Sequence, residues 1–353
     1  EVAEDIQKYL RPTLENIPFN RVPSADTLHR VLKELATDNT TVSSVSDKDY
    51  QFNINENLND LNIKSLLLTK QLNKNEFYDF DYDNQIIAHN KYDSKRTYKN
   101  TKGYFPGIAT IADKIVYIEN RDGNANVKTG QAETLSRAYK LLDNNKIKVN
   151  RSRMDAGSYS KEIIDTVAKN SRLFYIRANR CTAMTKQISE ITHWQSVEIN
   201  HQSYEIASIP FLQFFENRKY RLVVMREKNK DGQTNIFTGD NFIYRSILTN
   251  DWNSSEEDII KYYNMRGASE KLFDVLNNDF GWSRLPSSDI NCNTVFLILT
   301  AMMKNFYNYL IEKVSKVFQD IPPTSRIKRF IFSFISVAGK WMRQSRQWKL
   351  KLY

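Results

Sequence analysis

The stretch Phe77-Tyr78-Asp79-Phe80-Asp81-Tyr82-Asp83 alternates aromatic residues with aspartates. A period of two places successive side chains on opposite faces of a β-strand. Asp79, Asp81 and Asp83 therefore share one face, and aromatic side chains occupy the other. The stretch predicts a strand that buries its aromatic side and presents a row of carboxylates.

The chain after this strand alternates strand-like and helix-like segments. A hairpin is expected at 107–112 and 115–119, split by Asp113-Lys114. Helices are expected at 132–142 and 161–169, and strands at 147–154 and 172–177, the first of which ends in Asp155-Ala156-Gly157. The order strand, hairpin, helix, strand, helix, strand predicts an α/β fold with a three-layer, RNase H-like core.

The rest of the chain divides around this core, and 353 residues suit two or three domains. Residues 1–70 are expected to be helical, with Ser24 or Asp26 capping one helix; they form either a DNA-binding helix-turn-helix or a plain helical lid. The first part of the core covers 71–179, a β-rich insertion 180–250, and the second, helical part of the core 251–320. A basic amphipathic helix is expected in 321–353 after Pro322-Pro323, with basic positions Arg326, Lys328, Arg329, Lys340, Arg343 and Arg346.

Composition limits the possible functions. Lysine and arginine number 51 against 41 acidic residues, a net charge of +10 that favours polyanionic partners, nucleic acid before anionic membrane. With 41% apolar residues the chain is not fully disordered. No apolar run approaches the roughly 20 residues that cross a bilayer. Two cysteines cannot build a disulfide framework, and the four scattered histidines lack the spacing of zinc ligands. We therefore expect a cytoplasmic protein without a zinc site.

Acidic residues at three separate places could form a metal site. They are the aspartates of 79–83, Asp155 at a strand end, and Glu270 in a helix after the insertion. Two divalent cations about 4 Å apart need carboxylates from different elements to hold attacking and leaving oxygens in line. On spacing alone the ordinary interpretation, solvated acids at strand ends and on helices, is favoured.

The helix around Glu270 changes this balance. At about 100° per residue, one polar stripe carries a tyrosine, an arginine, a glutamate and an asparagine: Tyr263, Arg266, Glu270 and Asn277. The opposite, apolar side carries Met265, Ala268, Leu272, Val275 and Leu276. Arginine makes bidentate phosphate contacts, to which a tyrosine hydroxyl can add one. The helix is therefore predicted to direct phosphate-binding groups and a carboxylate to one site, although a solvated polar face fits too.

Residues Tyr263-Asn264-Met265-Arg266-Gly267-Ala268-Ser269-Glu270 are similar to the tyrosine–arginine–glutamate–lysine signature of bacterial insertion-sequence transposases of the DDE class. The chain as a whole resembles the DDE group-1 transposases. The likeness is carried further by residues 80–85, 91–107, 153–158, 262–284 and 326–341. It implies an RNase H-like catalytic domain with a β-rich insertion between the second and third catalytic acids.

The resemblance also implies the metal ligands. Asp155 is expected to be the second carboxylate and Glu270 the third. The family's Asp-x-Asp-x-Thr pattern falls on residues 81–85 and favours Asp83 as the first, although glutamine stands at the threonine position and Asp81 stays an alternative. The lysine of the signature falls on Asn277, and Lys271 points about 100° away from the stripe. These carboxylates would hold two Mg²⁺ ions, with Mn²⁺ as a substitute.

Basic residues that follow the first aspartate strand suggest a DNA contact. Lys95, Arg96 and Lys99, together with Lys91 and Lys102, are interleaved with the tyrosines Tyr92, Tyr98 and Tyr104. They could track a DNA backbone, and a solvated charged loop fits equally well. Trp194 and Trp252 could stack on a base near the cleavage point, although tryptophan is more often a core residue.

The sequence therefore predicts a DNA transposase of an insertion sequence. It would bind terminal inverted repeats and target DNA as a homodimer, cleave phosphodiester bonds and transfer strands, in the bacterial cytoplasm at the nucleoid. Two alternatives remain: a transposase-derived DNA-binding protein without catalysis, and a general RNase H-like DNA nuclease.

Overall fold

The computed structural model describes residues 23–179, 181–211, 220–229, 241–336, 339–345 and 347–352. Within them, one eleven-stranded sheet runs through the molecule in the order β1-β2-β8-β7-β3-β9-β10-β14-β13-β12-β11. Its strands, in chain order, are β1 (Asn39–Ser43), β2 (Asp49–Asn53), β3 (Phe77–Asn84), β7 (Gly107–Ile111), β8 (Lys114–Arg121), β9 (Lys148–Met154), β10 (Leu173–Arg177), β11 (Gln195–Ile199), β12 (Gln202–Phe211), β13 (Tyr220–Lys228) and β14 (Phe242–Thr249).

Five neighbouring strands of this sheet have an RNase H-like topology. Strand β7 pairs antiparallel with both β8 and β3, whereas β9 pairs parallel with β3, and β10 parallel with β9. Helices α4 (Gln131–Asn144) and α5 (Lys161–Asn170) make the two crossovers. The predicted order of strand, hairpin, helix, strand, helix, strand is confirmed, with boundaries shifted by one or two residues.

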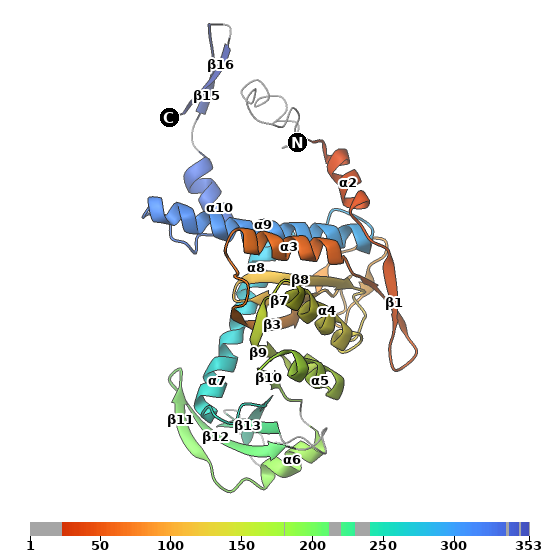
Figure 1. Ribbon diagram of the computed structural model, residues 1–353, viewed down its shortest axis with the longest axis vertical. Helices are drawn as coiled ribbons and strands as arrows, with labels where there is room; N and C mark the ends of the chain where they lie inside the picture. Colours follow the sequence, from red (N-terminus) through yellow and green to blue (C-terminus); the bar gives the residue numbers. More distant parts are fainter. Residues whose placement is uncertain are drawn as a thin grey trace.

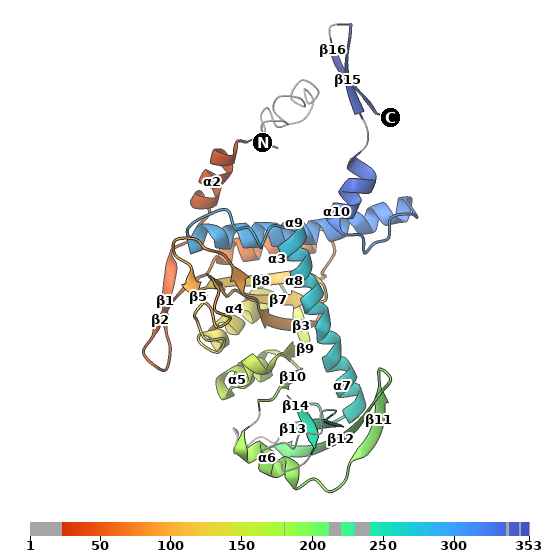
Figure 2. The ribbon, with the colours of Figure 1, turned by 180° about the vertical axis from the view of Figure 1, so that it is seen from behind.

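Helices cover both faces of the sheet and one edge of its central part. Helices α4 and α5 lie on one face (Figure 1), and α7 (Glu256–Asn264) and α8 (Ala268–Asp279) run along the other, as the reverse view shows (Figure 2). One core joins the sheet to α4 and α5, and separate apolar clusters join it to α7 and to α8. The arrangement is the three-layer architecture expected from the sequence.

The edge of β8 is covered by α3 (Glu56–Leu68) and the long helix α9 (Ile290–Val317). Asn59 of α3 accepts from the amide of Ile118 at 2.9 Å and donates to its carbonyl at 2.8 Å. Asn305 of α9 contacts Ile115 in the same way, at 3.0 and 2.8 Å. Asparagine side chains thus replace a neighbouring strand, so the buried backbone groups of β8 have partners.

The β-rich insertion continues the core sheet. Strand β14 pairs antiparallel with β10, and β13, β12 and β11 follow outward from it. A short helix, α6 (Thr182–Ser189), precedes these strands. Helices α7 and α8 then return the chain toward the centre, separated by a 3₁₀ turn, η4 (Met265–Gly267). The start of the second part of the core is therefore helical from Glu256 to Asp279, as predicted, but not as one uninterrupted α-helix.

The two terminal segments differ in part from the prediction. Ser24 caps α2 (Ala25–Glu34), as one of the two expected caps, by accepting from the amide of Thr27 at 3.2 Å. Between α2 and α3, however, β1 and β2 form a hairpin that was expected to be helical. Residues 1–22 of the predicted helical segment lie outside the described residues.

The C-terminal basic helix is shorter than predicted. The helical part covers α10 (Ile327–Phe330) and the π-helical turn η5 (Ile331–Ile335). The chain then forms a hairpin of β15 (Gly339–Gln344) and β16 (Gln347–Leu352), so Lys340 and Arg343 lie on a strand. Arg346 lies outside the described residues. None of the helices described is both long and apolar enough to span a membrane.

Candidate active site

Two arginines of β9 neutralise two of the three aspartates of β3. In the parallel register Asp79 lies opposite Arg151 and Asp81 opposite Arg153. Arg151 donates to both oxygens of Asp79, at 2.9 and 2.5 Å. Arg153 donates to both oxygens of Asp81 at 2.7 Å, and its remaining nitrogen donates to the carbonyl of Tyr262 at 2.8 Å. Asp79 and Asp81 therefore have partners within the sheet.

An acidic residue follows these pairs on each of the two chain segments. Asp83 is two residues beyond Asp81, and Asp155 is two residues beyond Arg153, immediately after β9 ends. Asp155 caps a 3₁₀ turn, η3 (Ala156–Ser158), and accepts from the amide of Gly157 at 3.0 Å. The pKa of Asp83 is raised to about 6, chiefly by burial; Arg266 lowers it, and the charge of Asp155 adds to the increase. The two carboxylates are thus close enough to repel each other.

Arg266 occupies the free side of Asp83. Its guanidinium lies 2.7 Å from Asp83 Oδ2, and the two side chains are 16% and 21% exposed. The residue comes from the 3₁₀ turn between α7 and α8, so the turn places a cation beside the ladder's last carboxylates. Burial lowers the pKa of Arg266, whereas Asp83 and Asp155 raise it, and the net direction is upward.

Tyr263 also faces the strand ends but is already engaged. Its ring is buried, at 8% exposure, and its hydroxyl donates to the carbonyl of Met154 at 3.1 Å. Burial raises its pKa to about 12. The tyrosine therefore fixes the end of α7 against the last residue of β9, next to Asp155.

Glu270 is not brought to the aspartate pair. It is exposed on the first turn of α8 and does not line the cavity that Asp83 and Asp155 share. Within the described parts of the chain, no three His, Cys, Asp or Glu side chains come close enough to hold one metal ion. Asn277 is half-buried, whereas Lys271 lines a different cavity together with Asp81 and Arg153.

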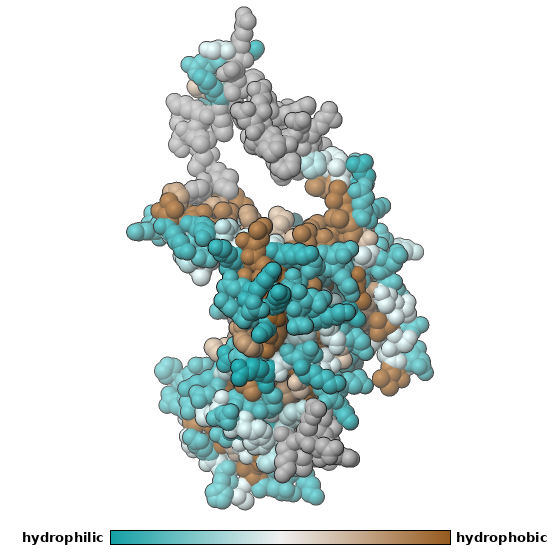
Figure 3. All heavy atoms as spheres, viewed as in Figure 1, coloured by the Kyte–Doolittle hydropathy of each residue, from teal (hydrophilic) through white to brown (hydrophobic). Residues whose placement is uncertain are grey.

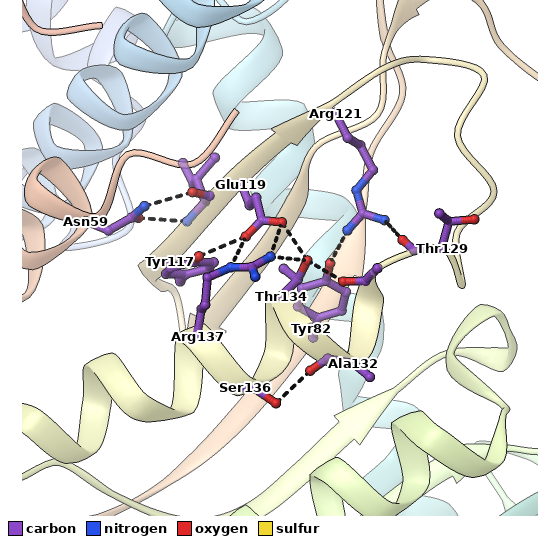
Figure 4. Close-up of polar contacts among 12 residues, drawn as sticks. Asn59, Tyr82, Tyr117, Glu119, Arg121, Thr129, Ala132, Thr134, Ser136 and Arg137 are labelled. Carbon is purple, nitrogen blue, oxygen red and sulfur yellow. Dashed lines mark hydrogen bonds and ion pairs between the residues drawn. The ribbon is translucent and has the colours of Figure 1, made fainter. Parts of the chain in front are cut away.

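A buried network stabilises the sheet behind Asp83 (Figure 4). Arg121 of β8 donates to the hydroxyl of Tyr82 at 2.9 Å and to the carbonyl of Thr129 at 3.3 Å. Glu119, which is fully buried, accepts two bonds from Arg137 of α4, at 3.0 and 2.8 Å. Arg121 thus connects the strand of Asp83 to the loop of residues 123–130, which forms one wall of the cavity.

The cavity around Asp83 and Asp155 has a volume of about 1130 Å³. Its other walls are the turn of the β1–β2 hairpin, the start of α5, and a small lobe that carries Tyr98. This lobe is a three-stranded sheet of β4 (Ile87–Ala88), β5 (Lys95–Arg96) and β6 (Lys102–Tyr104). Lys95, Arg96 and Lys99 are all exposed on it.

The two tryptophans predicted to stack on a base lie elsewhere. Trp194 packs beneath Arg226, whose guanidinium carbon is 4.0 Å from the ring centre, and donates to the carbonyl of Ile191 at 3.1 Å. Trp252 is 49% exposed. Neither residue lines the cavity that contains Asp83 and Asp155.

Sequence reasoning missed the arginine partners and the hairpin. Arg151 and Arg153 alternate with the same period of two as the aspartates, and this signal could have predicted the ladder. The hairpin wall has no comparable signal, because its strands are short and polar.

Asp83 and Asp155 fit a hard divalent cation such as Mg²⁺. They present carboxylate oxygens from two adjacent strand ends toward one cavity, and the burial of Asp83 and its repulsion by Asp155 would both be relieved by a bound cation. Arg266 is the cation that now compensates this negative charge.

Comparison with known proteins identifies the family of the chain. No curated protein matches the chain. A solved structure titled as the piggyBac transposase synaptic complex with hairpin DNA is similar at 10% sequence identity and a TM-score of 0.44, over 72% of this chain and 51% of that one. This chain thus spans about half the length of that transposase. A model of the transposase DDE domain, group 1, matches residues 8–353. The chain belongs to the family of group-1 DDE transposases.

Proposed function

We propose that the protein is a DNA transposase that binds terminal inverted repeats, cleaves phosphodiester bonds at them and transfers the freed strand to target DNA as a homodimer. The observation that carries the proposal is the ladder between β3 and β9. Two of its residue pairs match an aspartate with an arginine, whereas Asp83 and Asp155, just beyond the last pair, lie together at the cavity. A pair of like charges at the floor of a cavity is costly unless it binds a cation.

The difference between the aspartates that pair with an arginine of β9 and the one that does not also indicates which of Asp81 and Asp83 is the first metal ligand. Asp81 is held in a bidentate ion pair, and both side chains of the pair are nearly buried. Asp83 forms its ion pair with Arg266, on a separate helical segment, and accepts from the backbone amide of Asn84 at 2.9 Å. We therefore assign Asp83 and Asp155 as metal ligands and Asp81 as structural. Bound divalent cations would supply positive charge to the attacking and leaving oxygens of the phosphodiester.

Each residue then has a defined task in cleavage. Water attacks the phosphorus, the bond to the 3′ oxygen breaks, and that oxygen takes up a proton to leave a 3′-hydroxyl. In strand transfer the 3′-hydroxyl attacks a phosphodiester of the target in the same way. Arg266 would exchange Asp83 for a phosphate oxygen of the DNA. Tyr263 would keep α7 beside Asp155, and it could reach a phosphate only by releasing Met154.

Glu270 is assigned as the third carboxylate. Since it lies outside the cavity, the assignment requires α8 to turn toward the aspartates when DNA binds. The 3₁₀ turn of Met265–Gly267 is the place where such a rotation could occur. Lys95, Arg96 and Lys99, exposed on the lobe beside the cavity, would contact the DNA backbone.

One observation favours the alternative of a DNA-binding protein without catalysis. Among the described residues, no three carboxylates lie close enough to bind one metal ion, because Glu270 is exposed and lies away from Asp83 and Asp155. Such a protein would keep the basic lobe and the fold but would not cut. A general nuclease of the same fold would cut, without preferring a repeat end.

End cleavage distinguishes these functions. A labelled duplex that contains the terminal repeat flanking the gene is incubated with the protein and Mg²⁺, and in parallel with EDTA. We expect cutting at the repeat boundary that EDTA, Asp83→Asn and Asp155→Asn each abolish, while Asp320→Asn, at an exposed aspartate, leaves it unchanged. Binding without cutting would favour the derived DNA-binding protein. Equal cutting of a scrambled duplex would favour the general nuclease.

A further inference from the structure

Two large apolar or aromatic side chains among the residues that line the cavity of Asp83 and Asp155 are exposed. Tyr98 comes from the lobe after β5, and Val45 from the turn between β1 and β2. Both line the same cavity as the two aspartates. Neither is used by the chemistry of the carboxylates, so their exposure needs a separate explanation.

Tyr98 is held outward on a rigid turn. The amide of Thr97 donates to the carbonyl of Thr101 at 2.7 Å, and their hydroxyls lie 3.0 Å apart. The tyrosine ring is 71% exposed and touches the buried ring of Phe105 edge-on, with centroids 5.9 Å apart. The contact holds the tyrosine at one side while most of its surface stays accessible. Arg96 and Lys99 flank it in the sequence.

Val45 is fully exposed, although it is apolar. Its turn is closed by the amide of Ser44, which donates to the carbonyl of Lys48 at 2.9 Å. The hairpin is anchored to the core where the amide of Gln51 donates to the Asp122 carboxylate at 2.9 Å. Figure 3 shows the hairpin tip as an apolar patch on a mostly hydrophilic face. An isolated valine at the rim of a charged cavity has no role in packing.

We propose that this cavity is a nucleobase-binding site, in which Tyr98 stacks on a base of the DNA strand beside the scissile phosphate and Val45, from the β1–β2 turn, packs against the same strand. This inference rests on the proposed function, because it takes DNA as the ligand. An aromatic face flanked by cations binds single-stranded nucleic acid without needing a particular sequence, since every base has a π-face. The role predicted for Trp194 and Trp252 thus passes to a tyrosine at the cavity.

Photocrosslinking tests the stacking directly. The probe is a duplex with a short single-stranded 3′ overhang that carries 5-iododeoxyuridine, bound to the full chain in the presence of Ca²⁺. After irradiation, peptide mapping by mass spectrometry should locate the adduct on Tyr98. Tyr98→Phe should keep the crosslink, and Tyr98→Ala should lose it and weaken overhang binding about tenfold.

Matched variants separate the site from the surrounding surface. Tyr92 lies on the same lobe and is 94% exposed, but it does not line the cavity, so Tyr92→Ala should leave the crosslink and the affinity unchanged. Val45→Asp should weaken overhang binding, whereas the same substitution at Val317, which is 73% exposed on α9, should not.

The outcomes are distinguishable from failure of the proposed reaction. If end cleavage is absent but the crosslink maps to Tyr98, the nucleobase site stands and catalysis fails. If cleavage occurs and the adduct maps to Tyr92 or to a tryptophan, or if Tyr98→Ala binds like the wild type, the nucleobase site is refuted. If the protein binds no DNA, both proposals are refuted.

Discussion

The guanidinium of Arg266 lies 2.7 Å from Oδ2 of Asp83, whose carboxylate is also close enough to Asp155 to be repelled by it. The contact joins the 3₁₀ turn after α7 to the end of β3. The arginine compensates the negative charge of Asp83, which is largely buried and lies next to the second negative charge, that of Asp155. A metal ion at the pair must therefore compete with an arginine that belongs to the protein.

Removal of this arginine should strengthen metal binding in the absence of DNA. Arg266→Gln eliminates the competing cation and its repulsion of a divalent ion, and we expect the affinity for Mn²⁺ to rise about tenfold, or about 1.4 kcal/mol. Titration calorimetry at pH 8, where Asp83 is ionised, measures it. Arg266→Lys, which keeps the charge, should stay near the wild type. Equal Mn²⁺ affinities for Arg266→Gln and the wild type would show that Arg266 does not compete.

Metal binding should also depend on pH through Asp83. Burial raises the pKa of Asp83 to about 6, with a smaller upward contribution from Asp155 and a lowering by Arg266. Below this value the carboxyl is protonated and loses its affinity for a cation. Mn²⁺ binding should therefore fall as the pH drops from 7 to 5, while DNA binding to the lysines and arginines of the lobe persists. Mn²⁺ binding that is constant across this range would contradict the raised pKa.

The raised pKa of Asp83 also predicts how this residue affects stability, and the prediction differs from that for Asp81. A carboxyl whose folded pKa lies above its unfolded value of 3.8 contributes stability that is present below pH 4 and lost as the pH rises through about 6. Asp83→Asn, which mimics the protonated form, should therefore stabilise the protein at pH 7.5 by on the order of 2 kcal/mol. Near pH 3.5 the variant and the wild type should unfold alike.

Asp81→Asn should act in the opposite direction. It leaves Arg153, whose side chain is only 10% exposed, without its carboxylate partner. Breaking a buried pair in this way costs about 3–5 kcal/mol. Thermal unfolding of both variants at pH 7.5 tests the contrast. If Asp81→Asn unfolds at the same temperature as the wild type, or Asp83→Asn at a lower one, the division into structural and functional aspartates is wrong.

Much of the fold could be predicted because its elements have clear periods. The strand of residues 77–84 alternates, and α4 and α5 each bury one stripe. The β1–β2 hairpin could not be found in this way, since β1 buries none of its side chains fully and β2 joins β8 through only two residue pairs. The C-terminal hairpin was missed because basic residues at irregular spacing were interpreted as a helical face.

The site was predictable only in part. A period of two places Asp81 and Asp83 on the same face and cannot choose between them; the choice depends on the register of β3 against β9, which pairs Asp81 with Arg153. The structure does not keep the predicted polar stripe of the helix around Glu270 on one face, for a different reason. A 3₁₀ turn advances about 120° per residue instead of 100°, so three residues shift the phase by about 60°. Met265, expected on the buried side, is accordingly 60% exposed.

This phase shift leads to the prediction for Glu270. If α8 turns toward the aspartates only when DNA is bound, Glu270→Gln should leave Mn²⁺ binding to the free protein unchanged, since Glu270 is exposed and outside the cavity. In the complex with a repeat-end duplex, the same variant should lower the Mn²⁺ affinity and abolish cleavage. Asp83→Asn should lose Mn²⁺ binding in both states. Calorimetric titrations with and without the duplex compare the two variants, and Lys271→Gln, at the adjacent residue, serves as the control. A loss of Mn²⁺ binding by free Glu270→Gln would show that the glutamate already belongs to the metal site without DNA. If Glu270→Gln still cleaves, the third carboxylate is another residue, and no rotation of α8 is required.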